Sequence, residues 1–370
     1  MTIKDYEGKV SLEHSSGSST EGTSVLFIYL SLIRYGLELL ELLVNSLPIR
    51  EKSKLDGTKA IRGGIPLIFP QFAKASEPSA ETANLPQHGI ARVSTWKFLG
   101  AVTDNEEEVS ARFGLTDAQV PENFHKEWPK KFELIFTVTL TANTLKNTLE
   151  VRNNGTEPFE FNALLHTYYS VPISIKGLNE VTYLDKVNNF ARIRDVKDSI
   201  TIDQETDRIY MDVPKDEFII DLGQPDGVGN FTLKKLNLKD TVVWNPWIKK
   251  ALEMSDFGDD EYKKMVCVEP GTVTEYVKLE AGKTWECGQI IKVFALKSKL
   301  TKRDLTRKGT PKNKQMFLTK DSRKSKSMLL KREPARKRQL GTEAQKPLVG
   351  DIPKEYFLVI TITTREEMFF

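Results

Sequence analysis

Few residues of this 370-residue chain can transfer protons at neutral pH. Only four histidines are present, so a reaction that needs a group titrating near neutrality must use His14, His88, His125 or His166. His14 lies in a Ser- and Gly-rich leader and is a poor candidate, and the charged neighbours of His125 predict an exposed side chain. His88 and His166 therefore remain as candidates for acid–base chemistry.

A carboxylate that complements a histidine is Glu269, in the segment MVCVEPGTV. The pattern predicts that Glu269 ends an apolar strand and stands at the rim of a sheet, immediately before a Pro-Gly turn. A carboxylate base and a histidine acid can together move two protons at neutral pH. From the pattern alone, two other readings stay open: His166 as a core histidine and Glu269 as a turn acid in water.

Two stretches crowded with Gly and Pro, IRGGIPLIFPQF and LPQHGIAR, carry Arg62, Gln87, His88 and Arg92. This composition predicts fixed loops rather than regular elements. A guanidinium on a rigid loop suits the recognition of phosphate, because it offers two parallel donors, although each arginine alone could equally form a surface ion pair. Gly63 and Gly64 lack the spacing of nucleotide-binding motifs, so nucleotide binding is disfavoured.

Strands must position these side chains, because residues 96–291 read as a succession of strand patterns with no helices alternating between them. This arrangement predicts an all-β antiparallel sandwich. The predicted strands are 96–102, 108–115, 132–141, 144–153, 159–171, 231–238, 241–247, 265–271, 274–282 and 289–296. We predict a tight hairpin at 153–156 and a further loop at 280–283.

Strand alternation in the segment 159–171 predicts which side chains share a face with His166. The alternation places Leu164, His166 and Tyr168 on one face, and Ala163 and Leu165 on the other.

Composition describes an ordinary globular protein, with 39% apolar and 28% charged residues. The two cysteines form no C-x-x-C pair and have no nearby histidine cluster, so no zinc site is predicted and a reducing compartment fits best. The polar first residues lack the pattern of a secretory signal, and we expect a cytoplasmic protein.

The net charge of +3 is unevenly distributed along the chain. Residues 297–346 carry 18 Lys and Arg against 4 Asp and Glu, whereas residues 1–296 have a balance of −9. The basic stretch predicts a disordered tail, and contact with nucleic acid or an anionic membrane is the alternative interpretation. The apolar segment 25–47 contains internal charges, including Arg34 and Glu38, which make a membrane span improbable.

Several segments, taken together, resemble the hexose-6-phosphate mutarotase family of the aldose 1-epimerase-like superfamily. They are DGTKAIRGGIPLIFPQF (56–72), LPQHGIAR (85–92), WKF (96–98), FNALLHTYYSV (161–171), VVWNPW (242–247) and MSDFGDDEYKKMVCVEPG (254–271). The resemblance implies a large galactose mutarotase-like β-sandwich. We expect an atypical N-terminal segment at 1–51 that forms an incomplete edge of the sandwich, a catalytic domain at 52–295 and a basic low-complexity tail at 296–370.

The same resemblance implies that the protein interconverts the α and β anomers of hexose 6-phosphates, chiefly D-glucose 6-phosphate. It implies that ionised Glu269 takes the proton of the anomeric hydroxyl while protonated His166 gives one to the ring oxygen. Substrate-binding positions are then Arg62, Gln87, His88, Arg92 and Asp207. No metal or other cofactor is expected, the hexose phosphate is the expected partner, and a monomer without nucleic acid or membrane is predicted.

Two other functions stay open at this point. The first is a carbohydrate-binding sandwich without turnover. The second is a mutarotase for unphosphorylated aldoses, which the presence of Arg62 and Arg92 makes less favourable.

Overall fold

The computed structural model describes residues 2–6, 9–13, 47, 49–53, 59–74, 80–105, 107–170, 174–214, 216–221 and 230–293. These residues belong to one of the two units of the chain, and the other unit is Lys297–Val359. The predicted tail at 296–370, His14 and nearly all of the segment 25–47 therefore lie outside the described residues.

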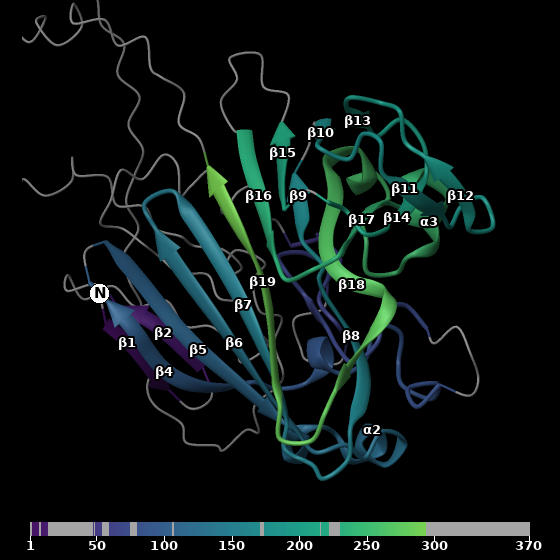
Figure 1. Cartoon of the computed structure of the whole chain (residues 1–370). Helices are drawn as coiled ribbons and strands as arrows, with labels where there is room; N and C mark the ends of the chain where they lie inside the picture. The colour runs from purple at the N-terminus through teal and green to yellow at the C-terminus, as the bar shows by residue number, and fades with distance from the viewer. Residues whose placement is uncertain are drawn as a thin grey trace, which may run out of the picture. The chain divides into compact units, whose positions relative to one another are not determined.

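Two large antiparallel sheets make up most of the described part of the chain (Figure 1). The nine-stranded sheet has the order β13 (Ile200–Thr201), β10 (Ser174–Lys176), β15 (Glu217–Asp221), β16 (Asn230–Leu236), β19 (Thr284–Val293), β7 (Thr144–Asn153), β6 (Phe132–Thr141), β5 (Glu108–Thr116) and β4 (Lys97–Asp104). The eight-stranded sheet comprises β12 (Ala191–Arg194), β11 (Thr182–Asp185), β14 (Thr206–Tyr210), β17 (Asp240–Asn245), β18 (Met265–Leu279), β8 (Phe159–Leu165) and β3 (Leu67–Ile68), with β9 (Tyr168–Ser170) also paired to β18. The predicted all-β sandwich is confirmed.

Smaller elements complete the described part of the chain. A separate hairpin joins β1 (Thr2–Tyr6) to β2 (Lys9–Glu13). The helices are short: α2 (Glu122–Glu127), α3 (Trp247–Glu253) and the 3-10 turns η1 (Ala91–Val93), η2 (Asp117–Gln119) and η3 (Glu261–Lys264). Among the described residues, no helix is long and apolar enough to cross a membrane.

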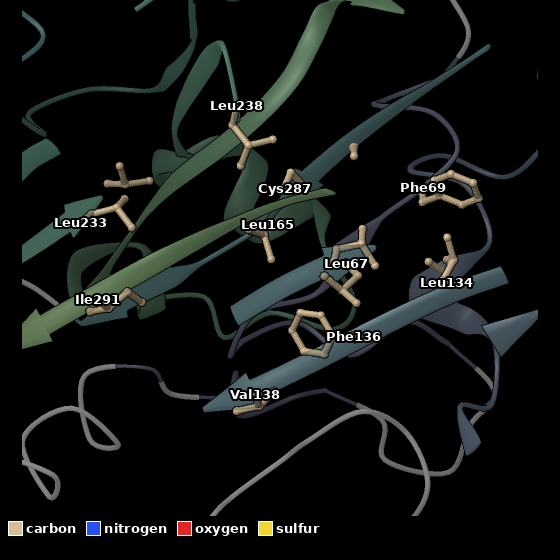
Figure 2. Close-up of a cluster of buried hydrophobic side chains, with 14 of the residues drawn as sticks. Leu67, Phe69, Leu134, Phe136, Val138, Leu165, Leu233, Leu238, Cys287 and Ile291 are labelled. Carbon is tan, nitrogen blue, oxygen red and sulfur yellow. The ribbon is translucent and has the colours of Figure 1, made fainter. Parts of the chain in front are cut away.

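The main core lies between the two sheets because alternate side chains of each strand are apolar. Leu134, Phe136 and Val138 of β6 are buried there together with Leu165 of β8 and Ile291 of β19 (Figure 2). On β8, Ala163 and Leu165 belong to this cluster, whereas Leu164 belongs to a second cluster with Val242. The predicted alternation holds within β8, but the predicted strand 159–171 is interrupted at His166 and Thr167, which connect β8 to β9. One face of the eight-stranded sheet points away from the main core.

The segment 153–156 does not form the predicted hairpin. Strand β7 pairs with β6 and β19, whereas β8 pairs with β18 and β3, so the chain passes from one sheet to the other after Asn153. The segment 280–283 is the predicted loop, and Gly282 there has a φ of 69°. Six further strands, β10 to β15, lie in a region for which no strand was predicted.

Strand β18 does not end at Glu269, contrary to the prediction of a Pro-Gly turn at the sheet rim. It continues through Pro270 and Gly271 to Leu279. On one side β18 pairs with β17 from Cys267 to Gly271, and on the other side β9 reaches only to Cys267 while β8 pairs from Gly271 onward. Pro270 lies in the interval between β9 and β8, so its missing N–H removes no ladder hydrogen bond.

Candidate active site

The candidate residues gather on the face of the eight-stranded sheet that points away from the main core. Glu269 and Cys267 of β18 share this face by the two-residue period of a strand, while the intervening Val268 lies in the main core. Glu269 pairs with Val242 of β17, and Trp244 on β17 pairs with Asp207 of β14. Three neighbouring strands therefore deliver these side chains to one place.

His166 reaches the same place from the connection between β8 and β9. Its backbone N–H donates to the carbonyl of Pro66, and the N–H of Tyr168 donates to the carbonyl of Gly64, so the connection is held against the 62–72 loop. His166 Nδ1 lies 3.3 Å from Oε1 of Glu269. The structure thus brings together two residues that are about a hundred positions apart in the chain.

Burial dominates the electrostatics of this pair. The side chains of His166 and Glu269 are 8% and 1% exposed. Burial raises the pKa of Glu269 well above its ordinary value, and the charge of Asp207 raises it further. Burial lowers the pKa of His166 well below its ordinary value, and the charges of Arg92 and Arg62 lower it further. In the unliganded protein the pair therefore favours a neutral carboxyl and a neutral imidazole.

Aromatic rings fix the orientation of the His166 imidazole. The ring of Tyr168 stacks on it with centroids 4.8 Å apart and an interplanar angle of 9°. Trp244 meets it edge-on at 6.1 Å, and His88 at 5.7 Å. These contacts restrict the imidazole on several sides, so its nitrogen atoms are aimed before a ligand arrives.

His88 is held by its own loop and presents a defined tautomer. Its Nδ1 accepts a hydrogen bond from the backbone N–H of Ala73 at 3.3 Å, so the ring proton resides on Nε2. Burial lowers the pKa of His88 well below its ordinary value, and the charge of Arg92 adds to this effect. His88 is thus a neutral imidazole with an N–H donor close to His166. Gln87 has an exposed side chain, and its amide group lies 3.4 Å from His88 Nε2.

The loop that carries His88 depends on a close backbone approach at Gly89. Gly89 forms a parallel bridge with Phe69, and its φ is 69°. A Cβ at this position would overlap the carbonyl group of Phe69 and the nitrogen of Pro70. We expect Gly89→Ala to lower the free energy of unfolding by about 1–3 kcal/mol beyond the cost of the positive φ itself. Urea unfolding measures this difference.

Gly282 supplies the matched control, because its φ is also 69° but no heavy atom would lie within 4 Å of an added Cβ. Gly282→Ala therefore has the same strain from a positive φ, but its Cβ overlaps no other atom. Equal unfolding midpoints for the two variants would contradict the close approach of Gly89 to Phe69.

Two arginines and an acidic partner lie beside the pair. Arg62 Nε forms an ion pair with Asp256 at 2.8 Å. Arg92, in η1, donates from Nη2 to the backbone carbonyl of Gln87 at 2.8 Å. Burial lowers the pKa of Arg92 to about 10, which leaves it charged at neutral pH. Among the described residues, no carboxylate forms an ion pair with Arg92, so its charge is available to an anionic ligand.

Asp207 of β14 is separated from Glu269 of β18 by strand β17, and it is paired with a lysine. Its Oδ2 is 3.0 Å from Nζ of Lys186, and Lys186 also lies over the ring of Phe72. The charge of Asp207 raises the pKa of Glu269 and that of Lys186 lowers it, which places both groups close to the acid–base pair. Asp207 is thus gathered with the other predicted residues.

Sequence reasoning missed several members of this cluster. Tyr168 had a usable signal, since alternation placed it on the face of His166. Asp256 lies in the segment 254–271 that carries the resemblance but received no role, and Lys186 had no signal, because its place in the site depends on its contact with Asp207. The site therefore combines predicted residues with partners that only the fold reveals.

Residues 33–292 match the family described as aldose 1-epimerase, which is more than half of the chain. The chain belongs to the aldose 1-epimerase family. It is accordingly an isomerase that acts on sugar anomers, and the family match includes all the predicted site residues.

The chain is similar to two named relatives and to one solved structure. Proteins of Cenchrus ciliaris and Escherichia coli, both named "Putative glucose-6-phosphate 1-epimerase", are 36% and 33% identical over 61% and 63% of this chain and 68% and 75% of their own. The crystal structure of a Salmonella typhimurium protein titled a "putative mutarotase" has a TM-score of 0.59 at 26% identity, covering 67% of this chain and 79% of that one.

Proposed function

We propose that this protein interconverts the α and β anomers of hexose 6-phosphates, chiefly D-glucose 6-phosphate, with His166 and Glu269 as its acid–base pair. The observation that carries the proposal is the buried contact of 3.3 Å between the imidazole and the carboxyl, in a member of the aldose 1-epimerase family. Relatives named for glucose-6-phosphate 1-epimerase support the choice of substrate.

The reaction requires two proton transfers and no net change in protons. Ionised Glu269 takes the proton of the anomeric hydroxyl while protonated His166 gives one to the ring oxygen, and the bond from C1 to the ring oxygen breaks. Rotation about the C1–C2 bond turns the other face of the aldehyde toward the returning hydroxyl. Reversal of both transfers closes the opposite anomer and restores the pair.

The protonation state favoured without ligand fits this cycle. A neutral carboxyl with a neutral imidazole holds the same one proton as a carboxylate with an imidazolium. The neutral carboxyl with the neutral imidazole is the state of the pair when the sugar ring is open. An anomeric hydroxyl that donates to Glu269 favours the carboxylate, and a ring oxygen that accepts from His166 favours the imidazolium, so bound sugar moves the proton to the reactive side.

The surrounding residues match a phosphorylated sugar. Asp207 and His88 offer an acceptor and an N–H donor suited to hydroxyl groups. Arg92 offers a guanidinium with no carboxylate partner among the described residues, and the charge of Arg62 is near enough to lower the pKa of Arg92. A phosphate can accept two parallel hydrogen bonds from one guanidinium group.

Proton NMR of freshly dissolved α-D-glucose 6-phosphate tests the proposal directly. The full chain is expected to accelerate the exchange between the two anomeric signals, with glucose and galactose responding less. Equal acceleration of all three sugars would favour a mutarotase for unphosphorylated aldoses. Uncatalysed rates for every sugar, with saturable binding of the sugar, would leave a carbohydrate-binding sandwich.

A further inference from the structure

A third side chain with ligand chemistry lies against the acid–base pair and takes no part in the proposed reaction. Cys267 precedes Glu269 by two residues on β18 and therefore shares its face. It is a free thiol, and its side chain is fully buried. One ligand atom each from His166, Cys267 and Glu269 lie within 4.8 Å of one another. Sequence spacing predicted no zinc site, because the histidine comes from a distant part of the chain.

The polar atoms of this cluster are buried without hydrogen-bond partners. Both carboxylate oxygens of Glu269 and the Nδ1 of His166 lack one among the described residues. Buried polar groups ordinarily find partners, so unpartnered atoms that lie this close together indicate a place for a ligand. The separation of 3.3 Å between His166 Nδ1 and Glu269 Oε1 is also that of two ligands on one tetrahedral zinc ion, about 3.3 Å for bonds of about 2.0–2.1 Å.

We propose that His166, Cys267 and Glu269 bind a zinc ion, and that this ion blocks anomer interconversion. A set of one imidazole, one thiolate and one carboxylate selects zinc over magnesium or calcium, because thiolate is a soft ligand and the latter ions take oxygen ligands. Binding displaces the protons of the thiol and the carboxyl into solvent. The blocking effect rests on the proposed function, whereas the metal site itself does not.

Inhibition follows from the identity of the ligands. A zinc ion bonded to His166 and Glu269 occupies the lone pairs through which both groups would move protons. The side chain of Cys267 adds the affinity that a histidine and a carboxylate alone lack, since three protein ligands with one open position form a common zinc site. The thiol thus makes the acid–base pair sensitive to a metal that the reaction does not need.

Cobalt spectroscopy of the full chain tests the metal site without reference to activity. After treatment with a chelator and its removal, the protein is titrated with Co²⁺, whose thiolate complex has a sulfur-to-cobalt charge-transfer absorption. We expect this absorption to saturate at one ion per chain and to disappear when Zn²⁺ is added. Its absence from the unaltered protein would overturn the proposal.

Two cysteine variants assign the signal. Cys267→Ser is expected to lose the charge-transfer absorption, whereas Cys287→Ser is expected to keep it, because Cys287 lies in the main core on β19 (Figure 2). Cys267→Ala serves as a second variant if the serine form does not fold, as judged by circular dichroism. Retention of the absorption in both Cys267 variants would exclude this thiol as a ligand.

The NMR assay then measures inhibition. We expect Zn²⁺ to abolish the enzymatic exchange of anomers in the unaltered protein and in Cys287→Ser, and a chelator to restore it. The Cys267 variants should need at least about 10-fold more Zn²⁺ for half inhibition. Loss of a residue that only hydrogen-bonds to a metal ligand already lowers metal affinity by about 10-fold or more, and loss of a ligand should cost at least as much. Equal inhibition of all variants would contradict the proposal. An inactive protein with a normal cobalt signal would instead refute the proposed function and leave the metal site standing.

Discussion

Glu269→Gln is expected to slow the interconversion of glucose 6-phosphate anomers by about 10²- to 10⁴-fold, the usual contribution of a positioned acid or base. Glutamine keeps the shape of the side chain but cannot accept the anomeric proton. Its amide is neutral, as is the carboxyl that burial favours without ligand, so binding of the sugar phosphate should persist. NMR exchange rates at saturating substrate, together with calorimetric binding, separate the two effects.

A matched control for this variant lies on the same strand. Glu275 is also on β18, but it is exposed and pairs with Lys239. Glu275→Gln should therefore leave the exchange rate unchanged. If Glu269→Gln also turned over at the normal rate, Glu269 could not be the base of the reaction.

Arg92→Gln is expected to lower kcat/KM for glucose 6-phosphate by about 10- to 100-fold while changing the turnover of glucose little. A hydrogen bond to a charged group contributes about 1.5–3 kcal/mol, and each 1.4 kcal/mol corresponds to about tenfold. Glutamine preserves a donor and removes the charge that no described carboxylate neutralises. Initial rates with both sugars, measured by NMR across a range of concentrations, give the ratio that decides the role.

Arg152 provides the comparison for Arg92. It lies on β7 and already forms ion pairs with Glu133 and Glu150, so its charge is compensated. Arg152→Gln should leave the preference for the phosphorylated sugar unchanged. Equal losses on glucose and glucose 6-phosphate in Arg92→Gln would show that Arg92 supports the fold of its loop instead of binding phosphate.

The geometry of the site could be anticipated from the sequence only in part. Alternation placed His166 and Tyr168 on one face, and the structure agrees because the period of a strand is a local property. The environment of Glu269 was predicted wrongly. A Pro-Gly pair ordinarily ends a strand, and only the interval between β9 and β8 explains why β18 continues through it and buries the carboxyl.

The sequence by itself determined the sandwich class, several strands of the nine-stranded sheet and the motif residues of the site. Strands such as 132–141 and 144–153 have the predicted bounds, because the alternation of apolar and polar residues is a pattern between neighbours in the sequence. Tertiary structure alone decided the passage between sheets after Asn153, the strands β10 to β15 and the meeting of His166 with Cys267 and Glu269. The physical reason is that sheet pairing joins residues far apart in the chain, so burial and charge at the site arise from contacts that no local pattern contains.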